Sequence, residues 1–197
     1  MKTLLSVCVF LSSLITGCSQ TLEPIALSAP DMTRQATLMQ AFAQRQSTRE
    51  FSPKMLSKQD LSDLLWAANG INRPESGKRT APSAMNRQDI EIYVCLEKGA
   101  YFFDHKENAL LPVTDRDIRT MKEAPVCLIL VAKGTGDQTW GAVDAGIVSQ
   151  NISLFCAGAG LATVPRGSMD TGGIIRALRL SGDRTPLLNH PVGYFRK

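Results

Sequence analysis

The sequence predicts an α+β protein in which helices pack against a β-sheet. Helical apolar spacing and strand-like runs are mixed along the chain without a strict βαβ rhythm. A continuous apolar run from Val126 to Ala132 has the length of a central strand. A longer apolar stretch, from Trp140 to Ala159, has the length of a major helix. No internal repeat is visible, so these elements predict one sheet-centred domain.

The first seventeen residues are typical of an export signal. A short basic start, Met1 to Thr3, precedes an apolar run from Leu4 to Ile15, which is shorter than the roughly 20 residues of a membrane span. The run ends in Ile15-Thr16-Gly17-Cys18, which resembles the lipobox of bacterial lipoproteins. We therefore expect residues 1–17 to be removed and Cys18 to carry lipid, anchoring the protein in the cell envelope, on the periplasmic side or at the cell surface. An ordinary cleaved signal with an unrelated cysteine is the alternative.

The mature chain has the size of one domain. Loss of 17 of the 197 residues leaves 180, enough for a substantial core. The polar segment 18–32 holds two prolines and predicts a tether between the lipid and a domain over residues 33–197. Loss of Lys2 lowers the net charge from +4 to +3. Such a mild charge, spread along the chain, argues against nucleic acid as a partner, and the membrane is expected to be contacted only through the anchor.

Two helices open the predicted domain. Apolar residues at helical spacing predict a first helix from about Asp31 to Gln46. Its buried stripe is expected to consist of Leu38, Met39, Phe42 and Ala43. Ser57 caps a second helix with Asp60 three residues on, and Gly70 ends it. Trp66 is expected to pack at the edge of the buried face of this second helix.

Strands and helices follow in mixed order. Ile90 to Leu96 has alternating pattern and β-branched content, which predicts a strand, with Tyr101 to Phe103 as its hairpin partner. The stretch from Trp140 to Ala159 is apolar on nearly all faces, so we expect burial on all sides, in the core and in a subunit interface. The other segments are predicted to be a loop over 72–79, short helices over 114–122 and 170–180, and a closing strand over 192–195.

The cysteines indicate no metal site. Three of them lie outside the signal and the lipidation site, each in an apolar run: Cys95, Cys127 and Cys156. They lack C-x-x-C spacing, and the chain has two histidines to join them, so buried unpaired thiols are predicted and no metal is expected.

The first candidate site is Arg45-Gln46-Ser47-Thr48-Arg49, at the end of the first predicted helix. Two guanidinium groups four residues apart, with a hydroxyl between them, would lie on one side of a helix end. Arginine supplies paired planar donors and serine a short neutral one, a combination that suits a phosphate. A solvated surface is the alternative.

The second candidate site is the loop from Lys78 to Asn86. Pro82 stiffens the turn, and the small residues Ser83 and Ala84 allow a flat group to approach the backbone. Asn86 offers both a donor and an acceptor. A heterocycle with alternating donors and acceptors would fit, and an ordinary surface turn is the alternative.

Two further segments carry groups that could bind a ligand. In Gly158 to Ser168 the long helix ends at glycine, and Pro165 and Gly167 flank Arg166, so exposed N–H groups of this turn could bond an acceptor. At the C-terminus, the cations of Arg196 and Lys197 could close on a phosphate.

These segments together resemble the FMN-dependent nitroreductase family, over nearly all of Gln44 to Tyr194. The stretch Leu64 to Asn86 is most similar to the branch related to peptide-modifying flavin dehydrogenases, with Leu-Leu-Trp-Ala-Ala-x-Gly followed by Arg-Thr-x-Pro-Ser-Ala. The resemblance implies a nitroreductase-like α+β fold with a central mixed, mainly antiparallel sheet flanked by helices. It also implies an intertwined homodimer with FMN at the interface.

The resemblance assigns the candidate residues to FMN. Contacts to the phosphate, ribityl chain and pyrimidine edge are implied for Arg45, Gln46, Ser47 and Arg49. Contacts to the flavin across the subunit interface are implied for Pro82, Ser83, Ala84 and Asn86. The resemblance implies that one turn lies along the isoalloxazine, with a main-chain N–H of Arg166 or Gly167 near N5. This turn consists of Val164, Pro165, Arg166, Gly167 and Ser168. Many relatives reach a basic phosphate ligand after Gly-Tyr-Pro; here Phe195 replaces that proline, and Arg196 or Lys197 is the candidate for this role.

The implied function is that of an FMN-dependent oxidoreductase. In a ping-pong reaction a donor gives a hydride to flavin N5 and leaves, and a small aromatic or other organic acceptor then takes the electrons, so no catalytic side chain is required. The alternatives are a flavin dehydrogenase that oxidises an organic or peptide-derived substrate, and a non-catalytic flavin-binding lipoprotein. NAD(P)H is the family's ordinary donor, but an exported protein is separated from that cytoplasmic pool. The donor, the acceptor and the direction of the reaction therefore stay open.

Overall fold

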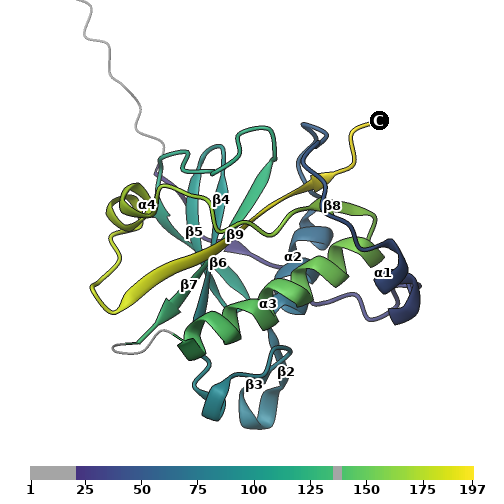
Figure 1. Cartoon of the computed structure of the whole chain (residues 1–197), viewed down its shortest axis with the longest axis horizontal. Coiled ribbons are helices and arrows are strands. Elements are labelled where there is room, and N and C mark those ends of the chain that lie inside the picture. Colours follow the sequence, from purple (N-terminus) through teal and green to yellow (C-terminus); the bar gives the residue numbers. More distant parts are fainter. Residues whose placement is uncertain (1–20, 135–138) are drawn as a thin grey trace, which may run out of the picture.

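A seven-stranded sheet forms the centre of the molecule and carries helices on both faces (Figure 1). The computed structural model describes residues 21–134 and 139–197. The strand order is β1-β6-β5-β4-β7-β9-β8, and every neighbouring pair runs antiparallel. Its strands are β1 (Ile25–Ala26), β4 (Ile90–Leu96), β5 (Gly99–Asp104), β6 (Ala109–Thr114), β7 (Val126–Lys133), β8 (Leu161–Thr163) and β9 (Arg184–Tyr194). The predicted α+β class with a mainly antiparallel sheet is confirmed.

Within the described ranges, four α-helices cover this sheet. They are α1 (Leu38–Gln44), α2 (Lys58–Asn69), α3 (Thr139–Gly158) and α4 (Thr171–Leu178). The first three pack together on one face and α4 lies on the other (Figure 1). The predicted loop over 72–79 is instead a small hairpin, with β2 (Ile71–Arg73) paired to β3 (Lys78–Arg79). No helix in the described ranges is long and apolar enough to cross a membrane.

The central strand β7 shows how the two layers are built. Its pleat sends successive side chains to opposite faces. Val126, Leu128 and Leu130 join the cluster beneath α2 and α3. The alternate residues Cys127, Ile129 and Val131 join the cluster beneath α4. Burial on both faces explains the continuous apolar run, and it confirms the predicted central strand.

The second helix and the first hairpin also follow the prediction. The Ser57 hydroxyl accepts a hydrogen bond from the N–H of Asp60 at 3.0 Å, which caps α2, and the helix ends before Gly70. β4 pairs with β5 as expected, with Leu96 opposite Gly99 at the turn. Cys95, Cys127 and Cys156 are buried free thiols.

Helix α1 is shorter than predicted. Thr37 and Gln40 form a reciprocal capping box, so the helix begins at Leu38, and the backbone of Arg45 has left the helical conformation. The expected buried stripe is wrong for the single chain, because Leu38, Met39 and Phe42 are 65%, 74% and 51% exposed. Ala41 is the buried residue of this helix.

The segment before α1 packs on the domain. β1 pairs with β6, the N–H of Ser28 donates to the Ser62 hydroxyl at 2.9 Å, and the N–H of Asp31 donates to Asp63 at 2.9 Å. The part of the predicted tether from β1 onward is therefore folded onto the domain and is not a free linker. The predicted signal peptide and the predicted lipidation site, Cys18, lie outside the described residues.

Two other predictions differ from the structure. The predicted helix over 114–122 is absent: Thr114 ends β6 and residues 115–122 form turns and bends. Arg119 pairs with Asp117 at 2.8 Å, and the Lys122 ammonium donates to the Asp117 carbonyl. The hydrogen bond from Arg119 holds the pKa of Asp117 well below its usual range. Helix α3 is buried on one face, whereas Trp140 and Val143 stay exposed. In a single chain this helix is therefore not buried on all sides.

Candidate functional site

The 45–49 segment is extended chain that runs beside β8. The N–H of Thr48 donates to the carbonyl of Thr163 at 2.9 Å. The helical argument for its spacing is therefore wrong, since α1 ends at Gln44. Four predicted ligands on this segment are exposed: Arg45, Gln46, Ser47 and Arg49. Among the described residues, neither guanidinium has an ion-pair partner, so both are available to an anion.

The C-terminus lies next to this segment. Phe51 and Phe195 form an antiparallel bridge, and the N–H of Ser52 donates to the carbonyl of Tyr194 at 2.9 Å. Figure 1 shows the end of β9 beside the chain that follows α1. Arg196, one residue after the bridge, is exposed. The structure thus brings the C-terminal cations to the side of the molecule that carries Arg49.

The turn after β8 completes this region, with one change to the prediction. The N–H of Arg166 donates to the carbonyl of Asn189 at 2.9 Å, and the N–H of Asn189 returns a bond to Arg166 at 2.8 Å. The Arg166 N–H is therefore engaged within the chain. In the described ranges neither the N–H of Gly167 nor that of Ser168 has a hydrogen-bond partner, so Gly167 keeps an available main-chain donor. Val164 is buried, whereas Pro165 and Gly167 are exposed.

A cavity of about 170 Å³ lies where these segments meet. It is lined by Gln44, Gln46, Ser153, Ala157, Gly160, Leu161, Thr163 and Phe195. This volume is below the range of about 300–1,000 Å³ that is usual for ligand sites. The single chain therefore encloses only part of a site for a cofactor-sized molecule. The described residues contain no cluster of three metal-ligating side chains.

A buried histidine supports the wall of this cavity. His190 lies between the hydroxyl of Ser149 at 2.8 Å and that of Thr163 at 3.3 Å. The Thr163 hydroxyl donates to the carbonyl of Pro191, so it must accept from the ring, and we assign the proton to Nδ1. Burial lowers the pKa of His190 to about 4, so the ring is neutral at pH 7. No spacing in the sequence connects these three residues, and sequence analysis missed them.

The 82–86 loop lies elsewhere, against the first half of α3. The N–H of Ala84 donates to both carboxylate oxygens of Asp144 at 3.0 Å, and Ser83 accepts a bond from the N–H of Gln88 at 2.8 Å. Met85 and Asn86 adopt left-handed backbone, with φ of 52° and 53°. Burial, and then the charge of Asp144, raise the pKa of the neighbouring Asp89. Sequence analysis did not connect Asp144 with the loop.

Helix α3 therefore separates two groups of predicted ligands. Asp144 holds the loop, whereas Ser153 and Ala157, 9 and 13 residues further on, line the cavity beside Gln46. At 1.5 Å per helical residue, these separations correspond to about 14 and 20 Å. One chain does not bring Pro82, Ser83, Ala84 and Asn86 to the cavity next to the 45–49 segment.

Comparison with known proteins identifies the class to which this fold belongs. The model of the nitroreductase family matches residues 42–194. A nitroreductase-like protein of Methanocaldococcus jannaschii is 28% identical over 196 residues, which cover 87% of this chain and 97% of the relative. The crystal structure of a nitroreductase-like protein from Ralstonia eutropha has a TM-score of 0.83 at 34% identity, over 88% of this chain and 90% of that one. A Clostridium acetobutylicum structure named as an NADH oxidase shares the fold, with a TM-score of 0.57 at 22% identity, over 82% of this chain and 89% of that one.

The chain belongs to the nitroreductase family. This confirms the resemblance seen in the sequence motifs. Membership indicates oxidoreductase chemistry that depends on a flavin.

Proposed function

We propose that the protein is an FMN-dependent oxidoreductase that moves a hydride from a donor to a small aromatic or other organic acceptor in a ping-pong reaction. The observation that carries this proposal is that parts of three candidate segments lie side by side, with Gln46, Thr163 and Phe195 lining one cavity. The Thr48–Thr163 hydrogen bond joins the 45–49 segment to β8, and the Phe51–Phe195 bridge adds the C-terminus.

Residues next to this cavity in the chain, though not in its lining, have groups that fit FMN. Arg45 and Arg49 are exposed cations without ion-pair partners in the described ranges, and the Ser47 hydroxyl lies between them in the chain. Such a set suits a phosphate. The Gly167 N–H offers a main-chain donor to the flavin ring, which is how proteins tune such a cofactor.

No acid or base of this chain is assigned to the reaction. When bound, FMN supplies the hydride chemistry. The cavity is lined by amide, hydroxyl, small and apolar side chains. His190 lies behind Thr163 and is neutral at pH 7, because burial lowers its pKa to about 4. The role of the chain is to hold the phosphate, orient the ring and exclude water.

We further propose that a second copy of this chain completes the site. The loop at Asp144 and the cavity at Ser153 lie about 14 Å apart on the same helix. In a two-fold pair with antiparallel α3 helices, the loop of each chain would meet the cavity of the other. The exposed apolar residues of α1 and α3 would be covered in this arrangement, notably Leu38, Phe42, Trp140 and Val143.

The binding of FMN to the purified mature protein tests the proposed function. Wild type should bind FMN and show the absorbance of a flavoprotein. Arg45→Ala/Arg49→Ala should weaken FMN binding by about 100-fold or more, because hydrogen bonds to charged groups contribute about 1.5–3 kcal/mol each. Arg116→Ala/Arg179→Ala, at two exposed positions away from the cavity, is the matched control and should bind normally. Folded wild type that binds no added FMN would refute the proposal.

We also propose that the protein is a lipoprotein of the cell envelope. The six residues from Ser19 to Pro24 separate Cys18 from β1. Fully extended, six residues span at most about 20 Å, so the domain would be held close to the membrane surface. Cys18→Ser should move the protein from the membrane fraction to the soluble fraction, and an unchanged distribution would contradict the anchor.

A further inference from the structure

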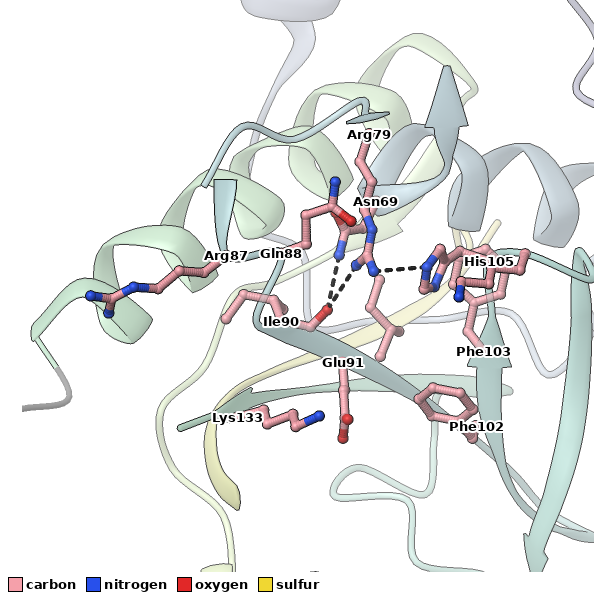
Figure 2. Close-up of a pocket in the computed structure, with 12 residues that line it drawn as sticks. Asn69, Arg79, Arg87, Gln88, Ile90, Glu91, Phe102, Phe103, His105 and Lys133 are labelled. Atoms are coloured by element: carbon pink, nitrogen blue, oxygen red, sulfur yellow. Dashed lines mark hydrogen bonds between the residues drawn. The ribbon is translucent and has the colours of Figure 1, made fainter. Parts of the chain in front are cut away.

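A second cavity, of about 320 Å³, is drawn in Figure 2, and it shares no lining residue with the cavity beside the 45–49 segment. The end of α2, strand β3 and the strands β4, β5 and β7 contribute to its walls. Its twelve lining residues are Asn69, Arg79, Arg87, Gln88, Ile90, Glu91, Ile92, Phe102, Phe103, His105, Lys106 and Lys133. None of the predicted FMN ligands is among them.

Arg79 is the central feature of this cavity. It is 8% exposed, and the described ranges contain no ion-pair partner for its guanidinium. Nη1 donates to the carbonyl of Ile90 at 3.4 Å, Nη2 lies 2.8 Å from Nε2 of His105, and Nε is buried without a hydrogen-bond acceptor. Two of the five N–H groups of the guanidinium are thus engaged. A buried cation with spare donors and no carboxylate within ion-pair distance is a costly arrangement that an anion would relieve, since Glu91 and Asp89 act on this charge only from further away.

His105 leaves the charge of Arg79 uncompensated. A guanidinium only donates, so Nε2 of His105 must accept and the ring proton is assigned to Nδ1. Burial, and then the charge of Arg79, lower the pKa of His105 to about 4. The ring is therefore neutral near pH 7. Figure 2 shows Arg79, His105 and the Asn69 amide directed to the same region, where Asn69 also donates to the Ile90 carbonyl at 3.0 Å.

The remaining charges make the cavity cationic. Lys106 and Lys133 line it together with one carboxylate, Glu91. Both oxygens of that carboxylate are bonded to Arg184, at 2.9 and 3.1 Å. Arg87 also lines the cavity, but its guanidinium points away from Arg79 (Figure 2).

We propose that this cavity binds a small oxyanion, a carboxylate or phosphate group, with Arg79 as its main ligand. The guanidinium offers the planar donors that both groups accept. Ile92 and Phe103, both on the sheet face beneath α2 and α3, form an apolar part of the wall for the carbon skeleton of a small organic acid. The volume falls within the range of about 300–1,000 Å³ that is usual for ligand pockets. The cavity shares no lining residue with the predicted FMN ligands, although Arg79, Arg87 and Gln88 flank the 82–86 loop.

The two histidines of the chain provide a local test. Benzoate or inorganic phosphate would be titrated into the mature protein saturated with FMN, so that anion sites at Arg45 and Arg49 are already filled. At about 10 mM, a site with a Kd of 1 mM is largely occupied. The ring resonances of His105 should shift on titration, whereas those of His190, fully buried elsewhere, should not. A preference for benzoate identifies an organic acid as the ligand class, and a preference for phosphate identifies a phosphate group.

Arg79→Met is the decisive variant. It removes a cation that has no ion-pair partner, so the fold should survive, and anion affinity should fall at least about tenfold. Arg116→Met removes the same charge at an exposed position and should keep wild-type affinity. If Arg79→Met does not fold, Lys106→Gln/Lys133→Gln replaces it, with an expected loss of several-fold. An unshifted His105, equal shifts of both histidines, or unchanged affinity in the cavity variants would overturn the proposal.

Discussion

The 45–49 segment and residues 82–86 of the 82–88 loop are both predicted to contact the flavin, yet they are held in different ways. The segment is joined to β8 through its main chain at Thr48, and its charged side chains extend outward. The loop is shaped by side chains that accept from its own N–H groups, namely Asp144 and Ser83. The segment thus offers charge, whereas the loop offers a fixed surface of small residues. We infer that the first selects the phosphate and the second the shape of the ring.

The largest expected effect tests whether the segment and the loop of one flavin site come from different chains. If each site takes its 45–49 segment from one copy and its loop from the other, a pair of differently mutated copies regains one intact site. Arg45→Ala/Arg49→Ala and Ala84→Trp, each present in both copies, should weaken FMN binding by about 100-fold or more. Differently tagged heterodimers that carry one of these changes on each chain should bind about one FMN per dimer, because binding requires both halves of one site.

The matched control places all three substitutions on one chain and pairs it with wild type. Both sites of that heterodimer then contain a defect, so FMN binding should be absent. The opposite result, with binding in the control and none in the mixed pair, would show that each chain builds its own site.

A smaller effect concerns the histidines behind the two regions. His190 supports Thr163 beside the segment, and burial lowers its pKa to about 4. The unfolded chain, with a His pKa near 6.5, binds this proton first as the pH falls. The unfolding free energy should therefore decrease between about pH 6.5 and pH 4, with His190 accounting for about 3 kcal/mol.

His190→Gln should flatten this part of the pH profile, measured by urea unfolding at several pH values. His105, beside Arg79 near the loop, also has its pKa lowered to about 4 but is only partly buried. His105→Gln should flatten the profile less, because solvent screens its charged form. Equal effects of the two variants would show that burial does not control these pKa values.

Sequence patterns correctly predicted two kinds of element: helices whose ends are set by neighbouring residues, and strands that are buried on both faces. The β7 run and the Ser57 cap of α2 are examples. Prediction failed where specific contacts compete with apolar spacing. The capping box at Thr37 starts α1 late, and ion pairs of Asp117 turn the chain where a helix was expected.

The candidate site shows the same division. Residue types alone predicted the cations at Arg45 and Arg49, since phosphate recognition follows from their chemistry. The support of the loop by Asp144 could not be predicted, because it joins residues 60 positions apart. The engagement of the Arg166 N–H by Asn189 likewise depends on a bridge to β9, which no local pattern reveals.

The smallest expected effect is the difference in stability between a glycine and an alanine variant, and it has opposite signs in the loop and in the segment. Met85 is 77% exposed and has a φ of 52°, a conformation that costs an L-residue about 1–2 kcal/mol and glycine almost nothing. Met85→Gly should therefore be more stable than Met85→Ala by about 1 kcal/mol. Gln46, exposed in the 45–49 segment, is not among the residues with positive φ. There Gln46→Gly should be less stable than Gln46→Ala by about 0.5–1 kcal/mol, since glycine loses more conformational entropy on folding. Thermal unfolding of the four variants compares the pairs directly, and the same sign in both would mean that the loop is not held in a left-handed conformation.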